Sequence, residues 1–183
     1  MDKRSPVSFS TVMRWPVWKT GLTVRGATYD EIDALPRMQV QAGQLFRELD
    51  MALVADGPVP EIAGFVHAQQ AGRVLVAVDE ELVVGFVCLD VLDGCLHVEQ
   101  VTVVPDRGGQ GIGRRLMLAA EEVAREQGYE WMTLTAFRDV PFNGPFYESL
   151  GWRVLSAAIC LPVSLTCGGR RRRRASMPGR GSP

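Results

Sequence analysis

Three apolar segments follow one another in close succession, and their spacing restricts what this chain can fold into. They are RVLVAVD (73–79), LVVGFVCLD (82–90) and CLHVEQVTVV (95–104), with only two and four residues between them. Connections this short join strands as hairpins, so we expect three antiparallel neighbours. The chain must therefore be built around a sheet, and its helices must pack on that sheet.

The flanking segments add helices and further strands. We expect strands at 22–28, 131–136 and 151–155, a helical stretch at 29–49 that is broken near Pro36, and helices at 61–70, 112–127 and 144–150. Thr28 and Glu31 fit a capping box, and Asn143 is expected to cap the last helix. The fifth strand follows a helix and is therefore expected to lie parallel to the fourth. This order predicts an α+β fold with a mixed, mostly antiparallel central sheet flanked by helices.

The two ends of the chain differ from the middle. We expect an irregular segment at 1–20, one domain at 21–166 and a disordered basic tail at 167–183. The segment SAAICLPVSLTC (156–167) contains a proline, which predicts an edge strand or irregular structure. Six of the 20 basic residues lie at 168–183, which leaves 14 basic against 21 acidic residues, a net charge of −7, in the body. This balance argues against a nucleic-acid-binding domain.

The remaining composition predicts a cytoplasmic protein. The four cysteines form no CxxC pair, and with only two histidines no metal-ligand spacing is present, so we expect no metal. Neither a secretory signal nor an apolar run near the roughly 20 residues of a membrane span is found. The arginine run at 170–174 leaves open a second interpretation, a nucleic-acid or membrane adaptor.

The stretch VVPDRGGQGIGRRLM (103–117) predicts an anion site. Gly108, Gly109, Gly111 and Gly113 let backbone amides approach a ligand, and the helix that starts there adds its positive end. A Walker loop is excluded because it needs a lysine and a hydroxyl residue after its last glycine. A dinucleotide fingerprint is excluded because the glycines alternate and hairpin-linked strands come first.

A third pattern fits. A strand ending in V-x-V, then P-D, then x-x-x-G-x-G opening a helix resembles the acetyl-CoA loop of the GNAT superfamily of N-acetyltransferases. The segment PFNGPFYESLGW (141–152) is similar to the closing FY-x-x-L-G-[FW] motif of the same superfamily. Gly108 departs from the pattern, since the family usually has Gln or Arg at that position, and Arg107 stands one residue earlier.

The resemblance implies acetyl-CoA as co-substrate and a set of residues that bind it. These are the strand residues Val101, Thr102 and Val103, the loop residues Gly108, Gly109, Gln110, Gly111, Ile112, Gly113 and Arg114, and Asn143. It also implies that an amide near Val103 polarises the thioester carbonyl and that Tyr147 is the acid that protonates the leaving sulfur.

Two candidate bases lie on the fourth strand. His97 and Glu99 are two residues apart, so alternation predicts that they share one face with Val101 and Val103. The expected reaction is direct transfer of an acetyl group to a primary amine of a small molecule or peptide. The alternative is a regulatory domain that binds acyl-CoA without turning it over. The resemblance is compatible with a homodimer, and Arg47 is either a substrate anchor or a solvated helix residue.

Overall fold

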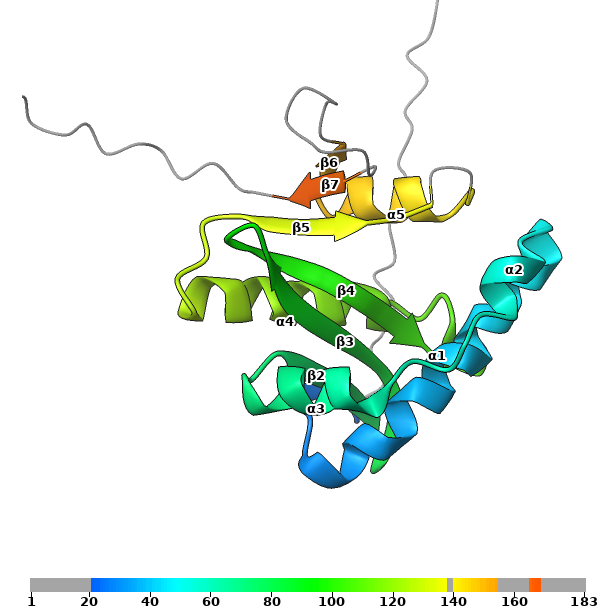
Figure 1. Cartoon of the computed structure of the whole chain (residues 1–183), viewed down its shortest axis with the longest axis horizontal. Coiled ribbons are helices and arrows are strands. Elements are labelled where there is room, and N and C mark those ends of the chain that lie inside the picture. Colours follow the sequence, from blue (N-terminus) through cyan, green and yellow to red (C-terminus); the bar gives the residue numbers. More distant parts are fainter. Residues whose placement is uncertain (1–20, 138–139, 155–164, 169–183) are drawn as a thin grey trace, which may run out of the picture.

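The computed structural model describes residues 21–137, 140–154 and 165–168 and forms a single mixed sheet (Figure 1). The strand order is β1-β2-β3-β4-β5-β7-β6. The strands are β1 (Thr23–Gly26), β2 (Val74–Asp79), β3 (Leu82–Leu92), β4 (Cys95–Val103), β5 (Met132–Thr135), β6 (Arg153–Val154) and β7 (Leu165–Gly168).

The helical segments alternate with these strands much as the sequence predicts. The α-helices are α1 (Leu35–Gly43), α2 (Ala52–Ala55), α3 (Ile62–Gln70), α4 (Ile112–Glu126) and α5 (Asn143–Ser149). Three 3-10 helices accompany them: η1 (Tyr29–Ala34), η2 (Gln44–Leu49) and η3 (Pro105–Arg107). Pro36 lies in the first turn of α1, where its missing N–H has no helical partner to lose.

Strand pairing confirms the α+β prediction. β2, β3 and β4 are antiparallel neighbours, and β5 runs parallel to β4. The expectation of an edge or irregular segment at 156–167 is wrong for its last residues. Leu165–Gly168 pairs with both β5 and β6, so it lies inside the sheet.

Helices cover both faces of the sheet. In Figure 1, α4 lies behind the strands, and α1 and α3 lie in front of them. The side chains of Leu116, Met117 and Ala120 on α4 are fully buried against Leu89 and other residues of the first face. Phe65 of α3 packs on the second face, edge-to-face with Phe86. β2 and β3 contribute side chains to both cores, whereas β4 contributes to the α4 core alone.

The capping box predicted at Thr28 and Glu31 forms, at the start of η1. The Glu31 carboxylate accepts a hydrogen bond from the Thr28 N–H at 2.8 Å and binds the Arg25 guanidinium through both oxygens, at 2.7 and 2.8 Å. These donors, Arg25 first, lower the pKa of Glu31 to about 2.

Both predicted ends of the chain fall mainly outside the described residues. β7 includes 167 and 168, the first two residues of the predicted tail, and 169–183 and 1–20 are not described. None of the helices within the described ranges combines the length and the apolarity that crossing a bilayer requires.

A cleft between two parting strands

β4 and β5 pair over only three residues and then diverge. The paired residues are Leu96–Val98 and Met132–Leu134, and Figure 1 shows the strands separating toward their C-terminal ends. A cleft of about 850 Å³ opens at the divergence. Residues of α1, η2 and the α2 region, β4, the glycine loop, β5 and α5 line it. It therefore reaches both sequence motifs at once.

The glycine loop presents backbone amides to one end of this cleft. Gly109 and Gly111 have φ of 70° and 75°, a left-handed conformation that glycine adopts without strain. The first helical bond of α4 joins the Arg115 N–H to the Gly111 carbonyl oxygen at 3.1 Å. The three N–H groups before Arg115 in α4 thus have no helical acceptor. Together with the helix dipole they form a site for an anion.

The residues predicted to bind coenzyme around the loop differ in whether they line the cleft and in the partners they already have. Gly108 lines the cleft, but its N–H donates to the Pro105 carbonyl oxygen and is used within the turn. Gln110 is exposed and is the one predicted coenzyme contact that does not line the cleft. Arg114 lines it and donates to the Ser149 carbonyl oxygen at 3.5 Å, whereas Arg107 lines it while paired with Asp79.

A β-bulge interrupts β4 and changes which residues share a face. Cys88 of β3 lies opposite Gln100, but the next residue, Leu89, lies opposite Val98, so Glu99 is the extra residue. The expectation that His97, Glu99, Val101 and Val103 share a face is therefore wrong. The α4 face of β4 instead carries Leu96, Val98, Val101 and Val103, and the other face carries His97, Gln100 and Thr102.

The two candidate bases differ in burial and in access to the cleft. Glu99 is exposed and lines the cleft. His97 is buried, does not line the cleft, and shares a hydrogen bond of 2.8 Å between its Nδ1 and the Thr133 hydroxyl. Burial lowers the pKa of His97 below its usual value, although the nearby Glu99 and Asp90 carboxylates act in the opposite direction.

Backbone groups of β4 face the cleft along the edge of the strand that lies away from β3. The Val104 N–H bonds to the Val84 carbonyl oxygen of β3 at 3.0 Å. In an antiparallel ladder the direction of these groups alternates, so those of Val101 and Val103 point away from β3, toward the space between β4 and β5. The Val101 carbonyl oxygen accepts a hydrogen bond from the Gln100 side chain at 3.2 Å.

Tyr147 lies on α5 in the wall of the cleft. Its ring packs edge-to-face with Phe146 and Trp152, with centroids 5.0 and 6.3 Å away. Burial raises the pKa of Tyr147, so its hydroxyl keeps its proton at neutral pH. A phenol in this state can donate a proton to an anion that forms in the cleft.

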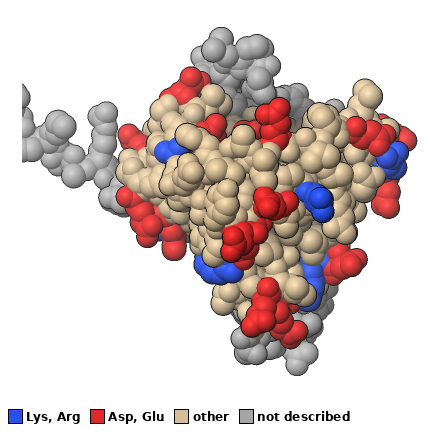
Figure 2. Space-filling view, turned by 60° about the horizontal axis from the view of Figure 1, so that its bottom comes forward, with Lys and Arg blue, Asp and Glu red and all other residues tan. Residues whose placement is uncertain are grey.

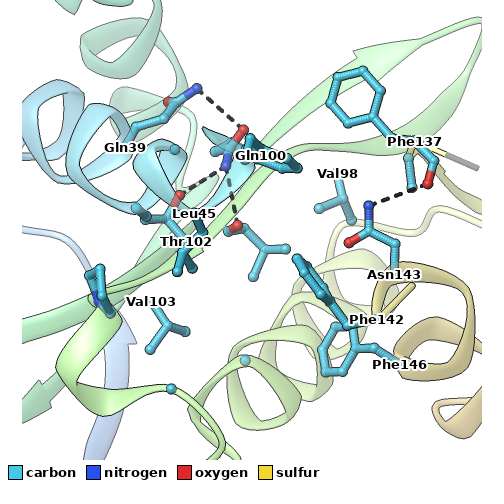
Figure 3. Close-up of a pocket in the computed structure, with 18 of the residues that line it drawn as sticks. Gln39, Leu45, Val98, Gln100, Thr102, Val103, Phe137, Phe142, Asn143 and Phe146 are labelled. Atoms are coloured by element: carbon cyan, nitrogen blue, oxygen red, sulfur yellow. Dashed lines mark hydrogen bonds between the residues drawn. The ribbon is translucent and has the colours of Figure 1, made fainter. Parts of the chain in front are cut away.

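Asn143 does not cap α5 as predicted. The N-cap is Phe142, which has helical φ and ψ of −94° and −17°, and Asn143 is the first helical residue. Its side-chain amide instead donates to the Phe137 carbonyl oxygen at 3.5 Å (Figure 3). Asn143 thus ties the start of α5 to the segment that leaves β5, and it lines the cleft there.

Two groups of residues in the cleft lie largely outside the predicted site residues, although the resemblance does place the segment LFRELDM (45–51) on the substrate side. The first is a polar row, in which Gln39 donates to Gln100 at 3.3 Å and Gln100 donates to the Thr102 hydroxyl at 2.9 Å (Figure 3). The second is the apolar end of the cleft, lined by Leu45, Phe46, Val54, Phe137 and Phe142. A bulge that moves Gln100 across the strand leaves no clear sequence signal, and Phe137 follows a strand with no motif around it.

Charge is unevenly placed along the cleft. Among the described lining residues only Glu99, Arg107 and Arg114 are charged, and both arginines flank the glycine loop. Arg47 pairs with Asp56 and does not line the cleft, so it is no anchor there.

Figure 2 shows acidic side chains spread over one face of the molecule, in keeping with the acidic body. Within the described ranges no cluster of metal-ligating side chains is found.

A family model matches most of the region described above. Residues 41–152 match the model of the acetyltransferase (GNAT) family. The match includes the glycine loop, Glu99, the aromatic residues of α5 and the apolar end of the cleft.

Solved structures show the same fold at low sequence identity. The PaiA N-acetyltransferase of Thermoplasma acidophilum, solved with coenzyme A, is 15% identical, with a TM-score of 0.66 over 81% of this chain and 99% of that one. A GNAT acetyltransferase of Brucella melitensis, solved with acetyl-CoA, is 19% identical, with a TM-score of 0.58 over 86% and 91%. The ribosomal-protein-S18-alanine N-acetyltransferase of Escherichia coli is 15% identical, with a TM-score of 0.62 over 88% and 99%.

Proposed function

The chain belongs to the GNAT acetyltransferase family, and from this premise we propose that it transfers an acetyl group from acetyl-CoA to a primary amine. The observation that carries the proposal is the meeting of two features in one cleft. The amide groups of the glycine loop lie at one end, and the unpaired edge of β4 leads away from them past Glu99 and Tyr147.

The residues of the cleft suit coenzyme A. Its pyrophosphate needs several converging N–H donors, which Gly109 through Gly113 supply, and a guanidinium, which Arg114 supplies. Its pantetheine arm is an extended amide chain, for which the outward-facing groups of Val101 and Val103 are suitable partners. The apolar faces of Val98 and Leu134 line the same stretch.

Each chemical demand of the transfer has a candidate residue. The coenzyme supplies the acetyl group as a thioester. The Val103 N–H polarises its carbonyl oxygen, as the family resemblance implies. As the C–N bond forms and the C–S bond breaks, Tyr147 donates its proton to the departing sulfur. Glu99 takes the proton released by the attacking nitrogen, directly or through water. No covalent bond to the protein is needed.

Two measurements on the full chain test the proposal. Titration calorimetry should detect acetyl-CoA uptake, and a thiol-release assay should detect coenzyme A in the presence of an amine. The variant Gly109→Asp places a carboxylate in the loop and should abolish uptake by repelling the pyrophosphate. Gly72→Asp is the matched control, because Gly72 also has a positive φ, of 67°, but lies in the turn before β2.

The outcomes separate the proposal from its alternative. Uptake without thiol release across a panel of amines would identify a regulatory acyl-CoA-binding domain. Absence of uptake by folded protein would remove both readings.

A further inference from the structure

The apolar end of the cleft holds an unusual amount of exposed hydrophobic surface. The side chains of Leu45, Phe137 and Phe142 are 45%, 47% and 52% exposed. Phe46 reaches across from η2 to meet Phe137 edge-to-face, with ring centroids 5.6 Å apart. Grouped exposed apolar side chains around a concave surface mark a binding site, because water contacts them at a cost that a ligand removes.

The charges that face this end restrict its ligand. Glu99 is the only charged side chain among the described residues that line this part of the cleft. A cationic amine would find one carboxylate there. A ligand with its own carboxylate would find no cationic side chain at this end among the described residues. Both arginines that line the cleft flank the glycine loop, and Arg47 pairs with Asp56 outside the cleft.

Further carboxylates lie behind a polar partition. A second cavity of about 320 Å³ is lined by Glu61, Asp90 and His67, and it shares Gln39, Pro60, Glu99 and Gln100 with the main cleft. The Gln39–Gln100 hydrogen bond stands at this shared boundary. A second ammonium group of a polyamine, lying in the main cleft, would therefore find no second carboxylate among the described lining residues.

We propose that the acceptor is a primary amine attached to an apolar body about the size of an aromatic ring. The acceptor carries one positive charge and no carboxylate. This inference rests on the acetyltransferase function proposed above and specifies its substrate class. The amine lies near Glu99, and the body lies against Phe46, Phe137 and Phe142. In Figure 3, Phe137 and Phe142 stand across the cleft from the Gln100 row, which leaves this space between them.

Matched amines test the inference in the thiol-release assay. Phenethylamine should be acetylated with a kcat/KM at least about tenfold above those of phenylalanine, which adds a carboxylate, and of spermidine, which adds charges, because burying a charge without a partner is costly. Phenylalanine methyl ester should recover most of the loss. Equal or better rates with phenylalanine or spermidine would overturn the inference.

Binding measurements keep the inference separate from catalysis. Phenethylamine should bind the complex of the protein with coenzyme A, and Phe137→Ala should weaken that binding roughly tenfold, since it removes a ring from the contact surface. Phe137→Leu should restore part of it. Leu53→Ala, which truncates a 94% exposed side chain outside the cleft, is the matched control and should change nothing.

The two proposals fail in different ways. Turnover of spermidine or phenylalanine, with phenethylamine neither bound nor acetylated, rejects the inference and leaves the acetyltransferase in place. Binding of phenethylamine with no turnover of any amine rejects the enzyme and leaves an apolar amine site. An unchanged affinity in Phe137→Ala overturns the placement of the aromatic body.

Discussion

The guanidinium of Arg107 lies 2.8 Å from the carboxylate of Asp79 and thereby fastens the glycine loop to the end of β2. The two partners differ in exposure, since the Asp79 side chain is 9% exposed and that of Arg107 is 29% exposed. Arg107 ends η3, one residue before the loop glycines. Through this ion pair Arg107 anchors the start of the loop.

The unequal exposure predicts an unequal effect of removing each partner. Arg107→Met leaves a buried carboxylate without its counter-ion and should lower the free energy of unfolding by about 3 kcal/mol. Asp79→Asn leaves a guanidinium that water reaches, and it should lower it by about 1 kcal/mol. Urea unfolding of both variants and of the double variant measures the coupling, and equal losses in the two single variants would contradict the prediction.

Gly85 lets β3 and β4 approach closely beside the cleft. A Cβ at this position would lie 2.7 Å from the Thr102 carbonyl oxygen and 3.3 Å from side-chain atoms of Leu116 and Val103. Gly85→Ala should therefore destabilise the fold by about 1–3 kcal/mol and weaken acetyl-CoA binding, because β4 must move. Gly26→Ala, with no atom within 4 Å of its Cβ, should leave coenzyme binding intact in the same titration.

Tyr147→Phe removes only the hydroxyl that we assign as the acid. The ring contacts with Phe146 and Trp152 remain, so acetyl-CoA affinity should be unchanged while kcat falls about 100-fold. Steady-state kinetics and calorimetry on the same protein make the comparison. Tyr29→Phe is the control, since Tyr29 is 65% exposed on η1. A normal kcat in Tyr147→Phe would contradict the catalytic role and leave this tyrosine with a packing role only.

Glu99→Gln should lower kcat/KM, mainly on the limb of the pH profile that rises toward alkaline pH. The reason is that this substitution removes the carboxylate that we propose receives the amine proton. Asp90→Asn removes a nearby carboxylate that lines the second cavity and not the cleft, so it should keep the normal profile. His97→Gln should also keep the shape of the profile, because His97 faces Thr133. A normal profile in Glu99→Gln excludes it as the base.

Glu31 gives the fold a pH-dependent contribution. The pKa of Glu31 is about 2 in the folded protein, below the usual value of 4.5. Its stabilising contribution is therefore complete above the pKa of the unfolded chain and is lost as the pH falls toward 2. Glu31→Gln should cost about 1 kcal/mol at pH 7, since Arg25 is 44% exposed and its pair contributes little beyond the cap. Urea unfolding should show the difference vanishing near pH 2. Glu122→Gln, an exposed helix position, should show none of this dependence.

The element order could be predicted because it depends on local spacing. Hairpin connections fixed β2, β3 and β4 as neighbours, and the glycine loop marked the start of α4. These signals lie within a few residues of one another in the chain. The parallel pairing of β5 with β4 followed from them, since a strand reached through a crossover helix is expected to run parallel to its neighbour.

The site details depended on contacts that no local pattern records. The bulge at Glu99 exists only relative to the pairing of β3, so alternation along β4 alone put His97 on the wrong face. Asn143 missed the cap because Phe142 already has helical dihedral angles. Leu165–Gly168 entered the sheet because β5 and β6 both offered free edges, which a proline upstream did not prevent.

The extra residue of β4 also separates folding from chemistry at a single position. Without residue 99, Val98 and Gln100 become adjacent, and the faces of the strand then alternate from Leu96 to Val103 without interruption. The pleat should then close, because Val98 and Gln100 already lie opposite the successive β3 residues Leu89 and Cys88. A deletion of residue 99 is therefore expected to leave the fold in place while removing the carboxylate that we propose as the base.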